Sequence, residues 1–197
     1  RPGWVEQDGR MLIEHAMGAC RAAVGRSGID PRGIAAVGFS AQRSVTCPVD
    51  AGGQPVRPMI SWQDARTAAE VEDLRAVVDP EAYYAQSGLP LGTTWILTKI
   101  LWMRKHEPEL YARTARFVQN QDLVLRAFGA DEFYTDLCSM GFYGLWDVRR
   151  AEWNRPLLDR LGLGPEQFGR PTLPGTQVGR IGPAAVAASG FAPGTPI

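Results

Sequence analysis

The sequence predicts a mixed α/β domain in which buried strands are interleaved with helices. Three observations support this fold class. Apolar residues recur at helical spacing after Asp8, and a short continuous apolar run over residues 34–39 has the character of a buried strand. The order helix, short loop, buried strand is half of an α/β unit, and the rest of the chain continues to mix helices and strands.

The composition suits a globular domain with a core of its own. The chain has 197 residues, 45% of them hydrophobic, and a formal net charge of zero. Zero net charge gives no electrostatic reason to expect nucleic acid or a membrane surface as partner. No run of about 18 apolar residues is present. The three cysteines are widely spaced, which indicates reduced thiols in a cytoplasmic protein rather than a disulfide framework.

In the first third of the chain, local signals predict one helix and three strands. Asp8 is a suitable N-cap for the first helix, and Gly28 is suited to its end. The predicted strand over 34–39 is followed by a second strand over 45–49. A third strand over 56–61 follows the turn sequence Asp-Ala-Gly-Gly-Gln-Pro.

Helices predominate in the rest of the chain. Thr67 and Glu70 have capping-box spacing, and the periodicity of 94–106 indicates an amphipathic helix with a basic outer face. The expected elements are helices over 62–74, 94–106 and from 108, a strand over 115–120, a helix over 122–128, loop and strand over 131–148, a helix over 152–163, a Gly/Pro-rich connector over 164–183 and a short Ala-rich helix.

Polar residues stand between the first two predicted strands, at Gln42, Arg43 and Ser44. A turn facing water is the simplest interpretation, because turns favour such residues. In open α/β sheets, however, ligands bind outside the carboxyl ends of the strands. An amide, a guanidinium and a hydroxyl can all form hydrogen bonds with a polyol, so the triplet is also a candidate binding site.

A second candidate site begins at Trp62, which follows the third predicted strand. Asp64 can act simply as a helix cap paired with Arg66. An indole also stacks well on the apolar face of a sugar, while a neighbouring amide and carboxylate accept or donate hydrogen bonds to its hydroxyls. The residues by themselves leave both interpretations open.

Several other site classes lack their signatures. His15 and His106 are the only histidines, and neither has a Cys or second His at ligand spacing, so we expect no metal site. The sequence has no Gly-x-Ser-x-Gly elbow and no glycine-rich phosphate loop of the Walker or Rossmann type. Residue chemistry alone therefore predicts polar groups at strand ends without specifying a reaction.

Taken together in order and spacing, five segments resemble the FGGY family of carbohydrate kinases, which includes glycerol kinase and xylulokinase. They are Pro-Gly-Trp-Val-Glu-Gln-Asp at 2–8, the strand and Gln-Arg-Ser at 34–44, Met-Ile-Ser-Trp-Gln-Asp-Ala-Arg-Thr at 59–67, Thr-Lys-Ile-Leu-Trp at 98–102, and a stretch with Thr-Asp, Trp and Leu-Leu at 134–163. Each motif is short, but their collinearity is specific.

The resemblance implies a ribonuclease-H-like domain of the actin-like ATPase superfamily, here incomplete at both ends. Residues 1–170 would be most of the N-terminal kinase domain without its first strands. Residues 171–197 would be a Gly/Pro-rich connector and the start of the segment that leads to the catalytic Asp. We expect that general-base Asp beyond residue 197, and the family's Asp-x-Gly-Thr phosphate loop before residue 1.

The resemblance also implies roles for individual residues. Arg43 and Ser44 match a pair that bonds substrate hydroxyls, and Trp62 matches an indole that packs on the substrate's carbon chain. Thr94 falls where glycerol kinase has a substrate-contacting Tyr. The neighbours Gln42 and Asp64 complete the predicted substrate-binding set.

By resemblance, the parent protein uses ATP and Mg²⁺ to phosphorylate a small sugar or polyol, with no nucleic acid or membrane partner. This chain alone is expected to be inactive and to bind neither ATP nor Mg²⁺ tightly. The identity of the sugar is left undecided, because Ser44 and Thr94 depart from the residues of glycerol kinase. Whether the protein forms a homodimer is left undecided as well. Two alternatives remain, a non-catalytic kinase-like sugar-binding or scaffold module and an actin-like ATPase of the chaperone or cytoskeletal type.

Overall fold

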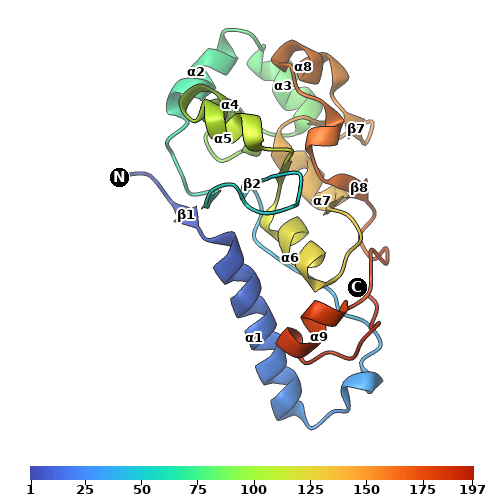
Figure 1. Cartoon of the computed structure of the whole chain (residues 1–197). Coiled ribbons are helices and arrows are strands. Elements are labelled where there is room, and N and C mark those ends of the chain that lie inside the picture. Colours follow the sequence, from blue (N-terminus) through green and yellow to red (C-terminus); the bar gives the residue numbers. More distant parts are fainter.

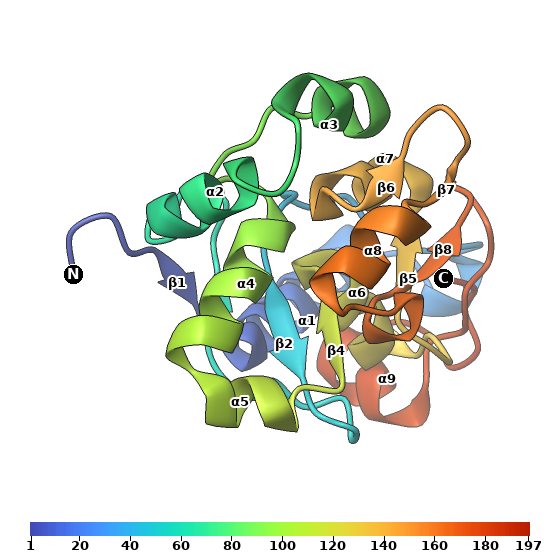
Figure 2. The same cartoon turned by 90° about the horizontal axis from the view of Figure 1, so that it is seen from above.

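Short strands that pair in twos form the centre of the molecule. The computed structural model describes residues 1–197. Its strand pairs are β1 (Glu6–Gln7) with β3 (Met59–Ile60), β2 (Cys47–Val49) with β4 (Arg116–Val118) and β6 (Trp146–Asp147) with β7 (Glu152–Trp153), all antiparallel, and β5 (Tyr134–Asp136) with β8 (Arg170–Thr172), parallel. Isolated bridges from Thr46 to Ile60 and from Phe117 to Phe168 link three of these pairs. Figure 2 shows β2 and β4 side by side.

Nine α-helices surround these strands. They are α1 (Gly9–Ser27), α2 (Ala68–Arg75), α3 (Pro80–Ser87), α4 (Ile96–His106), α5 (Pro108–Arg113), α6 (Asn120–Phe128), α7 (Leu137–Met140), α8 (Arg155–Leu161) and α9 (Pro183–Ser189). Figure 1 shows α1 and α9 together at one end of the molecule and α2 to α5 at the other. No helix has the length and apolar character needed to cross a lipid bilayer.

The first helix begins and ends as its sequence predicts. Asp8 Oδ1 accepts hydrogen bonds from the backbone N–H groups of Arg10 and Met11, at 2.8 and 3.1 Å. Gly28 ends α1 in the left-handed conformation, with φ of +69°, which a residue without a Cβ adopts at little cost.

Three apolar clusters form the core, and the two largest lie at opposite ends of the molecule. The larger one packs α4 against α8 and the β4 region, with Ile100, Phe117 and Leu158 almost completely buried. The second packs α1, α6 and α9 together around Phe128. Ile197 belongs to this second cluster, so the last residue of the chain is buried in the same core as the first helix.

The predicted buried strand over 34–39 is wrong. This segment is extended but pairs with no strand, and its one backbone hydrogen bond to a distant segment runs from Val37 N to Pro196 O at 2.9 Å. Ile34, Val37 and Phe39 are half-buried, while the residues between them are exposed. Apolar character alone does not make a strand, because no other strand of the chain lies alongside this segment.

The helix predicted over 62–74 begins later, at Ala68. Thr67 occupies the N-cap position but makes no capping hydrogen bond, because its hydroxyl donates to Thr98 Oγ1 at 3.1 Å. The Thr67–Glu70 capping box is therefore wrong, and the Glu70 carboxylate instead lies 3.1 Å from His106 Nε2.

The helix predicted over 152–163 is shorter, since its first two residues form β7 and Asn154 caps α8. Helix α3, which the sequence analysis did not predict, starts after Asp79, whose side chain accepts a hydrogen bond from Ala82 N at 2.7 Å. The strands predicted over 45–49, 56–61 and 115–120 and the helices predicted over 94–106 and 122–128 are present within a few residues of their expected bounds. Helix α7 lies in the stretch expected as loop and strand over 131–148, and β8 lies in the connector expected over 164–183, so neither element was predicted.

Candidate functional site

A hollow of about 410 Å³ brings five of the six predicted site residues together. Residues from four separate stretches of the chain line it: Ala41, Gln42, Arg43, Ser44, Trp62, Thr94, Trp95 and Phe142. Gln42, Arg43, Ser44, Trp62 and Thr94 belong to the predicted set. Trp95 and Phe142 were not predicted; Trp95 is the direct neighbour of Thr94, and Phe142 carries no local signal.

Ser44 is the most constrained residue of this hollow. It is only 2% exposed and has a left-handed backbone with φ of +58°, which non-glycine residues rarely adopt. Its N–H donates to Gln119 Oε1 at 3.3 Å, and Gln119 Nε2 donates to Ser139 O at 2.9 Å. The Gln119 amide thus ties the turn to a distant part of the fold, while the Ser44 hydroxyl has no hydrogen-bond partner in the chain.

Aromatic rings form another side of the hollow. The Trp62 indole is 45% exposed, which is unusual for so large an apolar surface. The guanidinium carbon of Arg43 lies 5.4 Å from the ring centroid of Phe142. The rings of Trp95 and Phe142 lie 5.9 Å apart, and Trp95 Nε1 donates to Pro90 O at 2.6 Å. The hollow therefore combines stacking surfaces with hydrogen-bonding groups.

Gln42 and Thr94 complete the polar lining. The Gln42 side chain is exposed, and its Nε2 donates to Gln7 Oε1 at 2.7 Å. Thr94 lies in the loop before α4, where its carbonyl oxygen accepts a hydrogen bond from Lys99 Nζ at 2.6 Å. Both residues are oriented by groups outside the hollow.

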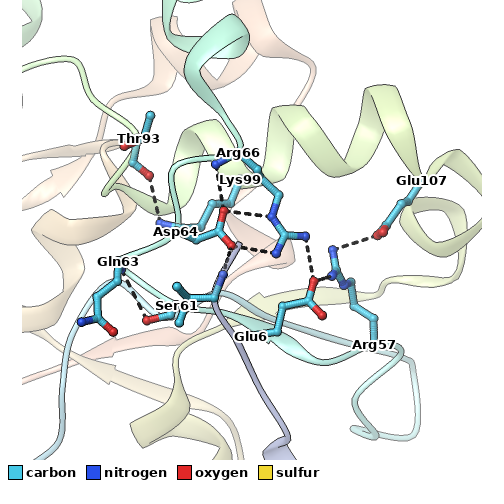
Figure 3. A network of polar contacts seen from close by, with 10 residues as sticks. Glu6, Arg57, Ser61, Gln63, Asp64, Arg66, Thr93, Lys99 and Glu107 are labelled. Carbon is cyan, nitrogen blue, oxygen red and sulfur yellow. Dashed lines mark hydrogen bonds and ion pairs between the residues drawn. The ribbon is translucent and has the colours of Figure 1, made fainter. Parts of the chain in front are cut away.

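Asp64, the sixth predicted residue, does not line the hollow. It is completely buried, and its carboxylate accepts hydrogen bonds from Val5 N at 2.6 Å and from the N, Nε and Nη2 atoms of Arg66 at 2.7–2.9 Å (Figure 3). Burial alone would raise the pKa of Asp64, but these hydrogen bonds outweigh it and hold the pKa below its ordinary value. The structure places Asp64 in an internal ion-pair network.

This network continues through Glu6. Arg66 Nη1 lies 2.7 Å from Glu6 Oε1, which also pairs with Arg57, and Arg57 Nη1 lies 2.9 Å from Glu107 Oε2 (Figure 3). Positive and negative charges thus alternate along one series of contacts, which runs from Asp64 through Arg66, Glu6 and Arg57 to Glu107. Alternation of this kind compensates charges that are removed from water.

Two indoles enclose the Arg66 guanidinium. Its central carbon lies 3.7 Å from the Trp4 ring centroid and 4.9 Å from that of Trp102, and the two rings meet edge to face at 5.4 Å. Trp4, Arg66 and Trp102 come from three of the motifs on which the family resemblance rests. These motif residues therefore form a buried cation–π and ion-pair cluster beside the hollow.

The basic outer face predicted for α4 does not include Lys99. Lys99 is fully buried, whereas Arg104 and Lys105 are exposed. Burial lowers the pKa of Lys99 to about 7, opposed by the nearby Asp64 carboxylate and reinforced by Arg66. The sequence held a signal for this, because Lys99 follows Ile96 by three residues and precedes Met103 by four, on the apolar stripe of the helix.

Outside the hollow, Asp122 is a completely buried acid. Asp122 accepts hydrogen bonds from Gln119 N at 2.9 Å and from Thr135 Oγ1 at 2.5 Å, and burial raises its pKa to about 7. No group of three or more His, Cys, Asp or Glu side chains is arranged to hold a metal ion. The residues of this chain therefore do not fit a metal centre of their own.

Comparison with known proteins decides the family. The family model for the FGGY family of carbohydrate kinases, N-terminal domain, matches residues 1–197. The chain belongs to the FGGY family of carbohydrate kinases. Among curated relatives, this FGGY chain is 31% identical to a glycerol kinase of Aromatoleum aromaticum over 84% of its own length and 34% of the relative's. A glycerol kinase of Thermococcus onnurineus is 30% identical over 83% of the chain and 34% of the relative. The FGGY chain thus spans about a third of these relatives.

Solved structures show the same fold. A ligand-bound xylulose kinase from Lactobacillus acidophilus superposes with a TM-score of 0.92 at 18% identity, over all of this chain and 39% of that one. A Plasmodium falciparum glycerol kinase with ADP gives 0.88 at 18% identity, over all of this chain and 40% of that one. A xylulose kinase from Rhodospirillum rubrum gives 0.85 at 25% identity, over all of this chain and 41% of that one. The predicted actin-like ATPase fold is confirmed.

Proposed function

We propose that the full-length FGGY protein transfers a phosphoryl group from ATP to a hydroxyl of a small sugar or polyol, and that the hollow of this chain binds this acceptor. One observation carries the proposal. Side chains implied by the family resemblance, from stretches around residues 42, 62 and 94, converge on a single hollow. Residues that lie so far apart in sequence meet only in the folded chain.

The chemistry of the lining suits a polyhydroxylated carbon chain. Arg43 offers several N–H donors, and the free Ser44 hydroxyl can both donate and accept. Trp62 presents an exposed indole face, which packs well on C–H groups. In this proposal, Gln42 and Thr94 supply further polar contacts at the rim, whereas Asp64 supports the site from within the fold.

Transfer of the phosphoryl group needs bound phosphates, Mg²⁺ and a base for the acceptor hydroxyl. The residues described here include no set that fits the metal, so we assign no step of ATP or metal binding to them. We propose that other parts of the full-length protein hold ATP and Mg²⁺ and supply the base. The division into an N-terminal kinase domain over 1–170 and a Gly/Pro-rich connector over 171–197 stays a prediction.

A coupled assay of ATP consumption by the full-length protein tests the proposal. The panel comprises glycerol, erythritol, xylulose, ribulose and fuculose. We expect saturable turnover with one of them, and a KM for that acceptor that rises about ten- to a hundredfold in Arg43→Ala, because a charged hydrogen-bond donor is lost. Arg26→Ala is the matched control, since Arg26 is an exposed arginine in the last turn of α1, away from the hollow.

Three outcomes would contradict the proposal. A folded full-length protein that binds ATP but consumes none with any acceptor would favour the non-catalytic module. Turnover that Arg43→Ala leaves unchanged would show that the acceptor binds elsewhere. Hydrolysis of ATP that no polyol accelerates would instead favour the chaperone or cytoskeletal type of ATPase.

A further inference from the structure

We propose that Lys99 is a positioning residue of the acceptor site, which holds the loop before α4 so that Thr94 and Trp95 line the hollow. The role in acceptor binding rests on the function proposed above. Lys99 itself does not line the hollow, so it acts through the backbone that it binds.

The geometry of the contact is specific. Lys99 Nζ donates to Thr93 O at 3.1 Å (Figure 3). It also donates to Thr94 O at 2.6 Å. The side chain of a helical residue points back toward the N-terminus of its helix, which directs Lys99 at this loop. Two carbonyl groups that would otherwise lack a protein partner are thereby fixed to the first turns of α4.

The helix itself gains little from an ammonium group at this place. The N-terminus of a helix carries a partial positive charge, so a buried cation there is unfavourable. Trp95 is the N-cap and makes no capping hydrogen bond with its side chain. An apolar residue would continue the stripe of Ile96 and Ile100 at lower cost. The contact that explains a lysine at this position is therefore the one to the loop.

The loop in turn positions two residues of the hollow. Lys99 binds the carbonyl groups on both sides of the Thr94 Cα atom, which belong to Thr93 and to Thr94 itself. Trp95 is the next residue. Trp95 is fixed at its far end by Pro90 O, and its ring lies 5.9 Å from that of Phe142 on the aromatic side of the hollow. If the anchor at Lys99 is removed, the segment from Pro90 to Trp95 keeps only the contact of Trp95 with Pro90 O and the two hydrogen bonds that the Thr98 hydroxyl donates to its backbone.

The burial of Lys99 and the charges around it make the strength of its hydrogen bonds to the loop depend on pH. Burial has the largest effect and disfavours the charged ammonium, Asp64 favours it, and the neighbouring Arg66, itself paired with Glu6, disfavours it. The pKa of Lys99 therefore lies at about 7. Hydrogen bonds from an ammonium are stronger than those from a neutral amine. The loop is expected to loosen as the pH rises through this value.

The test compares Lys99→Met with Lys105→Met in the full-length protein. Lys105 lies on the same helix but is exposed, and it contacts Asp73 rather than the loop. In Lys99→Met we expect the acceptor KM to rise about tenfold or more, with little change in kcat or in the KM for ATP. Hydrogen exchange at the amides of residues 92–96 should accelerate by a similar factor. Lys105→Met should change neither quantity.

A measurement on the unmodified protein keeps the inference testable even if Lys99→Met does not fold. Protection factors of residues 92–96, corrected for intrinsic exchange, should fall between about pH 6 and about pH 8.5, while those within α6 stay constant. Constant protection at 92–96 in this range, or an unchanged acceptor KM in a folded Lys99→Met protein, would overturn the proposal. If no polyol is a substrate but exchange at 92–96 accelerates in Lys99→Met, the proposed function fails and the anchoring role stands.

Discussion

The buried pair of Asp64 and Arg66 provides the sharpest test of how this fold is held together. Asp64→Asn keeps the size of the side chain but removes its charge. The amide also places an NH₂ group among four N–H donors, which come from Val5 and Arg66. Both side chains are completely buried, so the Arg66 guanidinium would lose one of its two counter-charges without gaining access to water.

The expected loss is large because a buried cation is left partly uncompensated. Removal of one partner from a buried ion pair typically lowers the free energy of unfolding by about 3–5 kcal/mol. For a domain of this size, that corresponds to a drop of roughly 6–20 °C in the thermal midpoint. The pKa of Asp64 is lowered in the fold, so its contribution is complete above the unfolded pKa of about 3.9 and is lost as the pH falls through the folded value. The midpoint is therefore measured near neutral pH by circular dichroism on the full-length protein.

The chain contains its own control. Asp30 and Arg32 have the same spacing, but their side chains are 61% and 85% exposed. Asp30→Asn should lower stability by less than about 1 kcal/mol. Equal midpoint shifts in Asp30→Asn and Asp64→Asn would refute the argument. The double variant Asp64→Asn/Arg66→Met should lose less than the sum of the single variants, because it leaves no unpaired charge.

Two further predictions concern single residues near the site. Ser44→Gly should raise the thermal midpoint slightly, because it relieves about 1 kcal/mol of strain in the left-handed backbone of Ser44. It should also raise the acceptor KM, because it removes a hydroxyl from the hollow. A lowered midpoint would mean that the hydroxyl stabilises the turn. For Asp122, the pKa of about 7 in the folded state exceeds the unfolded value of about 3.9. Between these two pH values the folded state binds more protons than the unfolded state, so the free energy of unfolding falls as the pH rises. Asp122→Asn should flatten this dependence in thermal midpoints recorded from about pH 4 to about pH 8, and an unchanged slope would contradict the assignment.

The helices were largely predictable because their signals are local. Asp8 and Gly28 mark the ends of α1 by their own backbone chemistry, and apolar spacing indicates α4 and α6. The errors arose where a distant group decided the outcome. Residues 34–39 have the composition of a strand but no strand beside them, and the hydroxyl of Thr67 bonds Thr98 instead of capping α2.

The candidate site shows the same division between local and distant information. The polar triplet at 42–44 and Trp62 were identifiable because they follow predicted strands, and the family resemblance added Thr94. Asp64 matched its motif equally well, yet its side chain points into the network with Arg66. Sequence position does not state which way a side chain points, because that depends on the partners that folding brings to it.

By itself, the sequence determined the fold class, the family and most of the residues that meet at the hollow. These follow from local periodicity, turn chemistry and the order of short motifs. Only the tertiary structure decided that Trp95 and Phe142 complete the hollow, that Lys99 binds the loop before α4, and that Trp4, Arg66 and Trp102 form one cluster. The physical reason is that hydrogen bonds, ion pairs and ring contacts act over a few ångströms in space, whereas the residues that make them are far apart along the chain.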